Sequence, residues 1–166
     1  MLARILYRGR QFFNIAFSGI MEEERRATEH LLSPAQRELF FGMPVQGQRH
    51  CLNVYYNLKA RRCEDIDLLR AALLHDVGKE GVSLWHRVAC VILGRICPRL
   101  LELLANGRPG SWRYGFYSNM HHAQRGATLA EASGASAVTV NLIRSHQDRG
   151  SSDPRLLTLQ EADEAS

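Results

Sequence analysis

The sequence predicts an all-α protein that folds as one compact helical bundle. Apolar residues recur along most of the chain at the three- and four-residue spacing that places them on one face of a helix. Residues typical of helix ends separate these segments, and no stretch alternates between apolar and polar residues as a half-buried strand would. With 166 residues, 45% of them hydrophobic, the chain can bury a core without disulfides or structural metals.

The N-terminal part, residues 1–32, is expected to be a helical extension that packs on the main domain, residues 33–166. Three arginines alternate with apolar residues in its first 17 positions. That pattern suits packing on the domain or, less commonly, binding to an anionic membrane. No segment has the apolar length of a signal peptide or a transmembrane helix. The four cysteines show no metal-binding spacing, so we expect a cytoplasmic protein with reduced thiols.

The first helix of the main domain is predicted to follow a capping box. Residues 33–36 read Ser-Pro-Ala-Gln, with proline at the first helical position. Gly42 and Pro44 end this helix. The next helix carries His50 and runs to about Leu58.

A third helix is predicted to carry an adjacent histidine and aspartate to its C-terminal end. Either Asp65 or Asp67 can cap its N-terminus. The helix then leads to His75 and Asp76, and Gly78 stands where a left-handed C-terminal cap is expected.

The remaining helices follow from Pro, Gly and capping residues. Residues 84–104 are predicted as one long apolar helix interrupted at Pro98, or as two helices that meet there. After a loop that begins at residue 106, helices are expected over residues 121–133, from residue 136 to about 146, and from residue 154 through 163.

Side chains that bind borderline divalent metals occur in most of these predicted helices. They are His50, His75, Asp76, His121 or His122, His146 and Asp163. A helical bundle can turn such residues toward one point. Leu156, Leu159 and Asp163 share one helix face, so this carboxylate is predicted to be buried, where it needs a cationic partner. Asp148 and Asp153 remain rival ligands, although Asp153 also suits a helix cap.

The order of these residues resembles the H…HD…D signature of the HD-domain superfamily of metal-dependent phosphohydrolases. His50, the Ala-Leu-Leu-His-Asp-Val-Gly-Lys segment at residues 72–79, and Asp163 carry the resemblance. It extends over residues 48–166 and implies an HD-type helical bundle, with residues 33–166 as the HD domain.

The resemblance also implies which residues bind metal. In members with two metals, a further histidine opens a helix as His-x-x-x-Gly, and His122 with Gly126 matches that form. Gly126 is then expected to leave room beside the metals. The implied ligands are His50, His75 and Asp163 for one ion and His122 and His146 for the other, with Asp76 bridging. The ions would be two of manganese, iron, cobalt or zinc.

The implied activity is hydrolysis of a phosphate ester of a nucleotide or dinucleotide by water activated at the metals. Asp76 and Lys79 are the expected catalytic residues, and Lys79, Arg125 and Arg149 the expected substrate-binding residues. A net charge of +4 suits such a small anionic substrate, but the arginines are too scattered to predict binding of a nucleic-acid duplex.

Two alternatives use the same ligand set. One is a mixed-valent di-iron oxygenase, and the other is a regulatory module that binds a nucleotide without turnover. The substrate is left open because the segment after His146 matches no subfamily. It lacks the Gly-Tyr-Pro of cyclic-dinucleotide phosphodiesterases and the His-Thr-Thr-Gly of diadenosine tetraphosphate hydrolases, and guanosine tetraphosphate hydrolases have a longer domain. Aromatic residues within 106–119 could stack on a base or simply pack.

Overall fold

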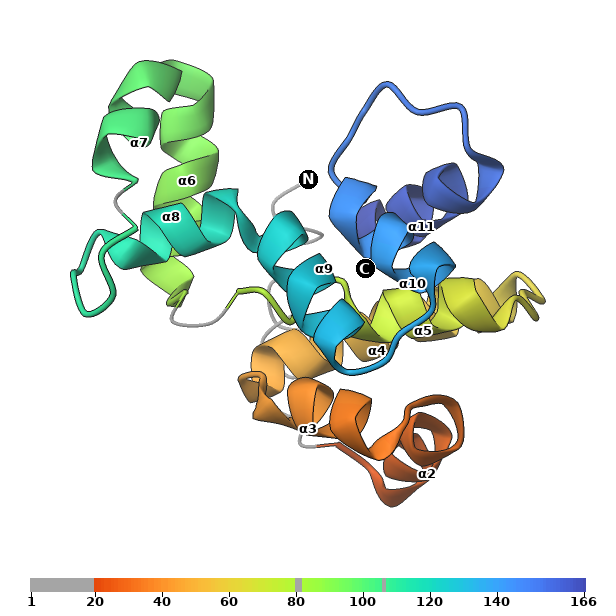
Figure 1. Cartoon of the computed structure of the whole chain (residues 1–166). Helices are drawn as coiled ribbons and strands as arrows, with labels where there is room; N and C mark the ends of the chain where they lie inside the picture. Colours follow the sequence, from red (N-terminus) through yellow and green to blue (C-terminus); the bar gives the residue numbers. More distant parts are fainter. Residues whose placement is uncertain (1–19, 80–81, 106) are drawn as a thin grey trace, which may run out of the picture.

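The computed structural model describes residues 20–79, 82–105 and 107–166, and every regular element in these ranges is an α-helix (Figure 1). The predicted all-α fold is therefore confirmed. In chain order the helices are α2 (Glu22–Leu31), α3 (Pro34–Gly42), α4 (Val45–Ala60), α5 (Ile66–Leu74), α6 (Leu84–Ile96), α7 (Pro98–Leu104), α8 (Tyr114–Met120), α9 (His122–Ala132), α10 (Ala137–Ser145) and α11 (Pro154–Glu164). None of these helices combines the length and apolarity needed to cross a bilayer.

Helix α5 is the centre of the main core. It contacts α2, α3, α4, α10 and α11. Its residues 68, 69 and 71–74 are all buried, so the helix is apolar nearly all round, as expected for a helix surrounded by others. The polar residues that directly follow α5, His75 and Asp76, are thereby held in the interior.

Capping hydrogen bonds confirm the predicted starts of α3 and α5. The Ser33 hydroxyl accepts a hydrogen bond from the Gln36 amide at 3.3 Å, and the Gln36 side chain accepts one from the Ser33 amide at 3.2 Å. Of the two candidate caps for α5, Asp65 is the one used, since its Oδ1 accepts from the amides of Asp67 and Leu68.

Asp67 has a different role, because it joins α5 to α10. Its Oδ1 accepts hydrogen bonds from the hydroxyls of Ser136 at 2.5 Å and Thr139 at 3.0 Å. Ser136 also caps α10 by accepting from the Thr139 amide at 3.1 Å. The helix that leads to His146 is therefore fixed to the helix that leads to His75.

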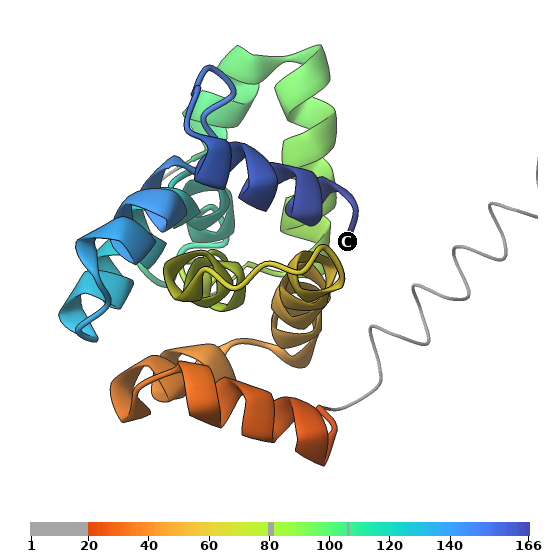
Figure 2. The ribbon, with the colours of Figure 1, turned by 90° about the vertical axis from the view of Figure 1, so that its right-hand side faces the viewer.

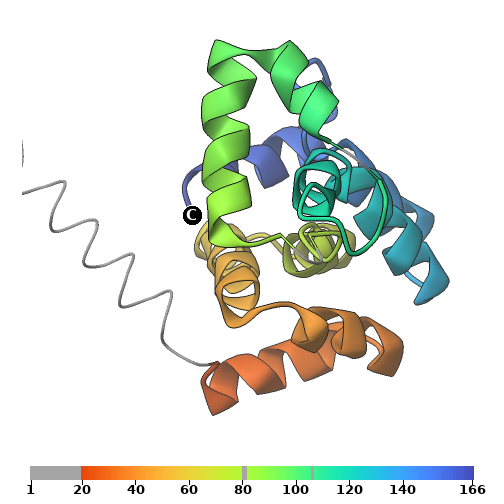
Figure 3. The ribbon, with the colours of Figure 1, turned by 90° about the vertical axis from the view of Figure 1, so that its left-hand side faces the viewer.

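Helices α6 and α7 form a separate part of the molecule. The predicted break at Pro98 yields two helices, and residues 114–120, expected as loop, instead form α8. The views in Figures 1, 2 and 3 agree that α6 and α7 lie at the end of the molecule opposite to α2 and α3. Cys90, Leu101 and Phe116 form a small apolar cluster there, distinct from the main core.

The predicted N-terminal extension can be followed from residue 20 onward, because residues 1–19 lie outside the described ranges. Helix α2 contacts α3 and α5. Glu24 of α2 is buried and forms two hydrogen bonds with the guanidinium of Arg49 in α4, at 2.5 and 2.8 Å.

Candidate metal centre

The six side chains predicted as metal ligands lie together, although they come from five separate segments. His50 is on α4, His75 and Asp76 are in the turn after α5, His122 is the first residue of α9, His146 directly follows α10, and Asp163 is near the end of α11. Four of them, His75, Asp76, His122 and His146, are at most 6% exposed.

Two groups within this cluster have the spacing of metal ligands, and they share Asp76. One group is His50, His75 and Asp76, and the other is Asp76, His122 and His146. Within each group the potential ligand atoms lie within 4.8 Å of one another. Asp76 Oδ1 is 3.6 Å from His75 Nε2 and 3.5 Å from His122 Nε2, so this carboxylate lies between the groups.

Asp163 adds a second carboxylate beside the first group. Its Oδ1 is 2.8 Å from His50 Nε2 and 3.6 Å from His75 Nε2. Its side chain is 33% exposed, so it is less buried than its helical spacing with Leu156 and Leu159 predicts.

Two buried atoms at the middle of the cluster have no hydrogen-bond partner among the described residues. They are His75 Nε2 and Asp76 Oδ1. A buried polar atom without a partner carries a substantial free-energy cost, so folded proteins usually satisfy it. Imidazole nitrogen and carboxylate oxygen are the donors that zinc, manganese and iron accept. The residues present therefore fit a divalent ion.

Three of the imidazole rings are oriented by backbone carbonyls. His75 Nδ1 lies 3.0 Å from the Ala72 oxygen, His122 Nδ1 lies 2.6 Å from the Asn119 oxygen, and His146 Nδ1 lies 2.7 Å from the Ile143 oxygen. Because a carbonyl oxygen can only accept, each Nδ1 must donate the proton. Each Nε2 then faces the cluster, and for a neutral ring this is the arrangement by which metal-binding histidines are commonly fixed.

Burial keeps two of the histidines neutral. It lowers the pKa of His122 to about 3, and the nearby Lys79 ammonium acts in the same direction. Burial likewise lowers the pKa of His146 to about 4, with an added contribution from His75. Both rings are uncharged at pH 7, which is the state that metal binding requires.

The two carboxylates of the cluster, Asp76 and Asp163, are deprotonated and favour nearby positive charge. Burial alone would raise the pKa of Asp76, but His75 and Lys79 hold that pKa well below its usual range. Burial alone would lower the pKa of His75, but the Asp76 carboxylate raises it well above the usual value. Burial would also raise the pKa of Asp163, but the nearby His50 and His75 imidazoles together lower that pKa. A bound cation would stabilise the negative charge of both carboxylates in the same way.

The turn that carries His75 and Asp76 is packed against α9 through two glycines. The expected left-handed cap at Gly78 is wrong: among the described residues, positive φ occurs at Arg62, Gly110 and Gly134. Glycine is needed at 78 for a different reason, since a Cβ there would lie far inside contact distance of the His122 carbonyl oxygen and 2.6 Å from the Gly126 amide.

Gly126 allows the same close approach between α9 and the turn after α5, rather than leaving room beside a metal. A Cβ there would lie 3.4 Å from both the Gly78 amide nitrogen and the His75 carbonyl oxygen. The missing side chain therefore leaves room for the backbone of the turn and for the Ile143 side chain, which would lie 3.3 Å from such a Cβ. This contact brings the start of α9, and with it His122, next to Asp76.

A cavity of about 520 Å³ opens beside the cluster. Its lining residues are Lys79, His122, His146, Gln147, Arg149, Gln160, Asp163 and Glu164. Lys79 Nζ lies 2.7 Å from Asp76 Oδ2, and Arg149 Nη1 lies 3.0 Å from Glu164 Oε1. Two of the three predicted substrate-binding residues, Lys79 and Arg149, thus face this space.

The third predicted substrate-binding residue, Arg125, is not among those lining residues. Its guanidinium contacts the Ser118 hydroxyl and lies over the Tyr114 ring, 5.3 Å from the ring centre. Ser118 in turn donates to the Gly78 carbonyl at 3.3 Å. Arg125 is therefore linked through Ser118 to the turn that carries His75 and Asp76.

The structure separates the remaining candidates. His121 is exposed, and its ring lies 4.4 Å from that of Tyr117, whereas His122 is buried in the cluster. Asp153 caps α11, and Asp148 is exposed.

Sequence reasoning missed Gln160 as a lining residue. Its side-chain amide donates to the carbonyls of His146 at 3.1 Å and Asp148 at 2.9 Å, which ties α11 to the segment after α10. No spacing rule marks a glutamine for such a role. Among the aromatic residues of 112–117, Trp112 and Phe116 pack against Trp85, whereas Tyr114 and Tyr117 stack on each other. None of these rings lines the cavity.

Comparison with known proteins agrees with this geometry. Searches of curated proteins and of solved structures gave no significant match. The family model of the HD domain matches residues 47–166, which is most of the chain and includes all six clustered side chains. Proteins of this family are in general metal-dependent phosphohydrolases. The chain belongs to the HD domain family.

Proposed function

We propose that this protein hydrolyses a phosphate mono- or diester of a nucleotide or dinucleotide at a centre of two divalent ions. The observation that carries the proposal is the pair of ligand groups that share Asp76, with unpartnered buried atoms on His75 and Asp76. Such atoms favour a bound cation over a purely structural cluster.

The proposed ligands are those implied by the sequence. His50, His75 and Asp163 would hold one ion, His122 and His146 the other, and Asp76 would contact both. Ions bound there would supply an activated water and neutralise charge on the phosphate group. The chain itself supplies neutral Nε2 atoms on His122 and His146 and a deprotonated Asp76, as their pKa shifts indicate.

Lys79 and Arg149 are proposed to bind the phosphate. Lys79 is held against Asp76 at one side of the cavity, with a side chain that is 20% exposed. Arg149 is paired with Glu164 at the surface, in an exposed ion pair that contributes little to stability and can be exchanged for a phosphate at low cost. Both residues would place positive charge where a phosphoester enters.

A nucleotide is the proposed substrate class because of the cavity's size and polar lining. A volume of about 520 Å³ lies within the range of sites for small organic ligands. Gln147 adds an amide side chain to the lining and can donate or accept hydrogen bonds. Asp76 and Lys79 remain the proposed catalytic residues.

A panel of phosphoesters tests the proposal. The purified protein, loaded in turn with manganese, iron, cobalt and zinc, would be assayed with nucleoside mono-, di- and triphosphates, cyclic nucleotides and dinucleotides. We expect at least one ester to be hydrolysed, and we expect His75→Ala and Asp76→Ala to abolish turnover. His121→Ala is the matched control, since this exposed neighbour of His122 should keep wild-type activity. A metal-loaded protein that hydrolyses none of these esters would refute the proposal.

The same preparation distinguishes the two alternatives. A mixed-valent di-iron oxygenase would show its iron pair by EPR spectroscopy of anaerobically prepared protein. A regulatory module would bind a nucleotide tightly without forming product under any metal.

A further inference from the structure

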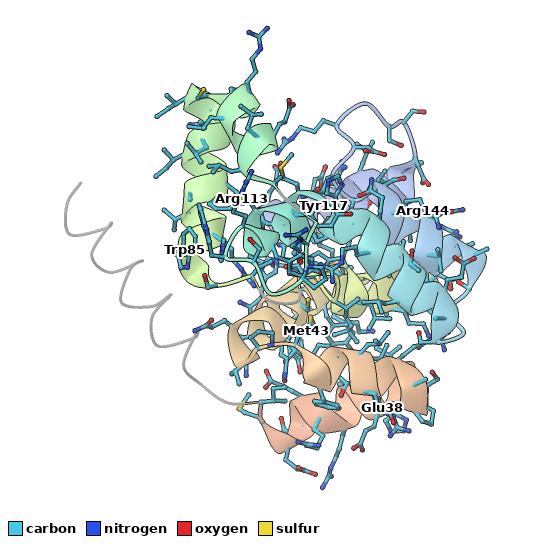
Figure 4. All side chains as sticks on the ribbon, turned by 60° about the vertical axis from the view of Figure 1, so that its left-hand side comes forward. Glu38, Met43, Trp85, Arg113, Tyr117 and Arg144 are labelled. Carbon is cyan, nitrogen blue, oxygen red and sulfur yellow. The ribbon has the colours of Figure 1, made fainter. Side chains whose placement is uncertain are left out.

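Helices α6 and α7 expose an apolar surface that takes no part in the candidate metal centre. Its large side chains, together with that of Trp112 in the turn before α8, are between 50% and 77% exposed: Trp85, Val88, Val91, Ile96, Leu103 and Trp112. We call this set the α6–α7 apolar face. Figure 4 shows Trp85 on the outer side of α6. Isolated exposed apolar residues are ordinary, but six large ones on two neighbouring helices and the adjoining turn, with the rings of Trp85 and Trp112 6.4 Å apart, favour a binding surface.

The position of these side chains follows from how α6 is packed. The main contacts of α6 are with α7 and α8, and the small Cys90, Leu101 and Phe116 cluster fills the space between them. Trp85, Val88 and Ile92 repeat at i, i+3 and i+7 on another side of the helix and are about half exposed. Within the described residues, α6 thus has apolar side chains on both an inner and an outer side.

This region also carries a net charge equal to that of the whole protein. Residues 84–113 contain five arginines and one glutamate, so their net charge is +4, and the formal net charge of the entire chain is +4. Three of the arginines, Arg87, Arg95 and Arg99, form no ion pair with other described residues. These three arginines therefore place positive charge on the helices of the apolar face, without an acidic partner in the described part of the chain.

The dimensions of the two helices determine how they could meet a membrane. Helix α6 has 13 residues, so it is about 20 Å long, which is less than the roughly 30 Å of a bilayer's hydrocarbon core. It is too short to span, but its exposed apolar side, which carries Trp85, Val88 and Ile92, could lie in the interfacial plane. Tryptophan prefers this interface, and arginine near it is attracted to anionic lipids.

We propose that the α6–α7 apolar face binds the surface of an anionic lipid membrane, with the tryptophans at headgroup level. Two other occupants are disfavoured by charge. A second copy would bring one +4 region against another, and residues 1–19 contain three arginines and no acidic residue. Like charges brought together repel, whereas an anionic surface attracts all of these arginines. The proposal does not depend on the hydrolase activity.

Intrinsic fluorescence tests this proposal directly because both tryptophans of the chain, Trp85 and Trp112, belong to the face. The full-length protein would be mixed with vesicles of phosphatidylcholine alone or with added phosphatidylglycerol. We expect the emission to shift to shorter wavelength, and the protein to co-sediment, only with the anionic vesicles. Added salt should weaken the binding.

Matched variants assign the binding to the face. Val91→Ser, Ile96→Ser and Leu103→Ser together should weaken vesicle binding by about tenfold or more, because they remove apolar area that the membrane would bury. The control combines Val45→Ser, Ile66→Ser and Leu157→Ser, which are 44–54% exposed in helices outside the face, and should bind as wild type.

A second pair of variants tests the charge. Arg95→Gln with Arg99→Gln should reduce binding by about thirtyfold, since each arginine near an anionic surface contributes about 1 kcal/mol and a tenfold change corresponds to about 1.4 kcal/mol. Arg26→Gln with Arg155→Gln, which replaces exposed arginines outside the region, is the control.

Three results would overturn the proposal. The first is an absence of binding to anionic vesicles. The second is binding without a change in tryptophan emission, which would place the contact at residues 1–19 or elsewhere. The third is a mass in solution that falls from dimer to monomer in the Val91, Ile96 and Leu103 variant, which would make the occupant a second copy. Circular dichroism of every variant confirms that it is folded.

Discussion

Single residues of the centre were predictable from sequence where the chemistry is local. His75 and Asp76 are adjacent and end an apolar helix, so their common position in the interior follows from the helix pattern alone. The choice of His122 over His121 came from the family's spacing, and the structure buries His122 and exposes His121.

Residue roles that depend on tertiary contacts were not predictable. Gly78 was expected to supply a left-handed cap, but its backbone is instead pressed against the start of α9. Arg125 was expected at the substrate, but its guanidinium contacts Ser118 and Tyr114. A sequence gives the residue type at each position. It does not give the residues that Gly78 and Arg125 contact, because the fold brings these from other segments of the chain.

Substitution of Gly78 tests the close approach of the turn to α9. Gly78→Ala should destabilise the protein by about 1–3 kcal/mol, because a Cβ there overlaps the backbone of His122 and Gly126 and forces the two segments apart. Denaturant unfolding measures the change, and metal content should fall with it. Gly42→Ala is the control: nothing lies within 4 Å of a Cβ there, so a small stabilisation of up to about 1 kcal/mol is expected. Equal effects of the two substitutions would refute this role of Gly78.

At the scale of helices, most starts and ends were predictable because capping is a local interaction. The capping box at Ser33, the cap at Asp65 and the Asp153-Pro154 start of α11 all form as expected. Helix α8 was missed because its sequence, Tyr-Gly-Phe-Tyr-Ser-Asn-Met, contains a glycine and reads as a loop. Gly115 is there because the His86 ring lies against it, where a Cβ would overlap. That contact joins segments nearly 30 residues apart.

The ion pair between α2 and α4 makes stability depend on pH. Burial alone would raise the pKa of Glu24, but hydrogen bonds from Arg49 lower it below its ordinary value. Because the folded-state pKa is below the unfolded one, the contribution is fully present above the unfolded value, about 4.5, and is lost as the pH falls through the folded-state pKa.

Glu24→Ala should therefore cost about 3 kcal/mol at pH 7, since it leaves the Arg49 guanidinium buried without this carboxylate. The cost should shrink at pH values below the folded-state pKa. Denaturant unfolding at several pH values measures both effects. Glu23→Ala changes an exposed neighbour and should alter stability by less than about 0.5 kcal/mol. A cost for Glu24→Ala that is the same at all pH values would contradict this account.

At the scale of the whole molecule, the described residues form two apolar clusters of unequal size. The main core contains α5 and surrounds the candidate metal centre, while α6 and α7 rely on a small cluster around Cys90, Leu101 and Phe116. Sequence periodicity predicted a single bundle, and it could not indicate that α6 and α7 would pack mainly on each other and on α8. The assignment of an apolar residue to one cluster or the other depends on topology.

Native-state hydrogen exchange tests this division. Amides of α6 and α7 should exchange through local opening with a lower free energy than those of α4 and α5, because few buried contacts hold them. Uniform protection of all four helices at the global free energy of unfolding would show that the two clusters form one cooperative unit.

The central claim is that six side chains form a two-ion centre around Asp76, and the metal content of purified protein tests it most directly. Elemental analysis should find two divalent ions per chain in the wild type and in His121→Ala. It should find about one ion in the double variant His122→Ala and His146→Ala, and almost none in Asp76→Ala. A wild-type protein that retains no metal after exposure to manganese, iron, cobalt and zinc, or an Asp76→Ala variant that retains both ions, would contradict the claim.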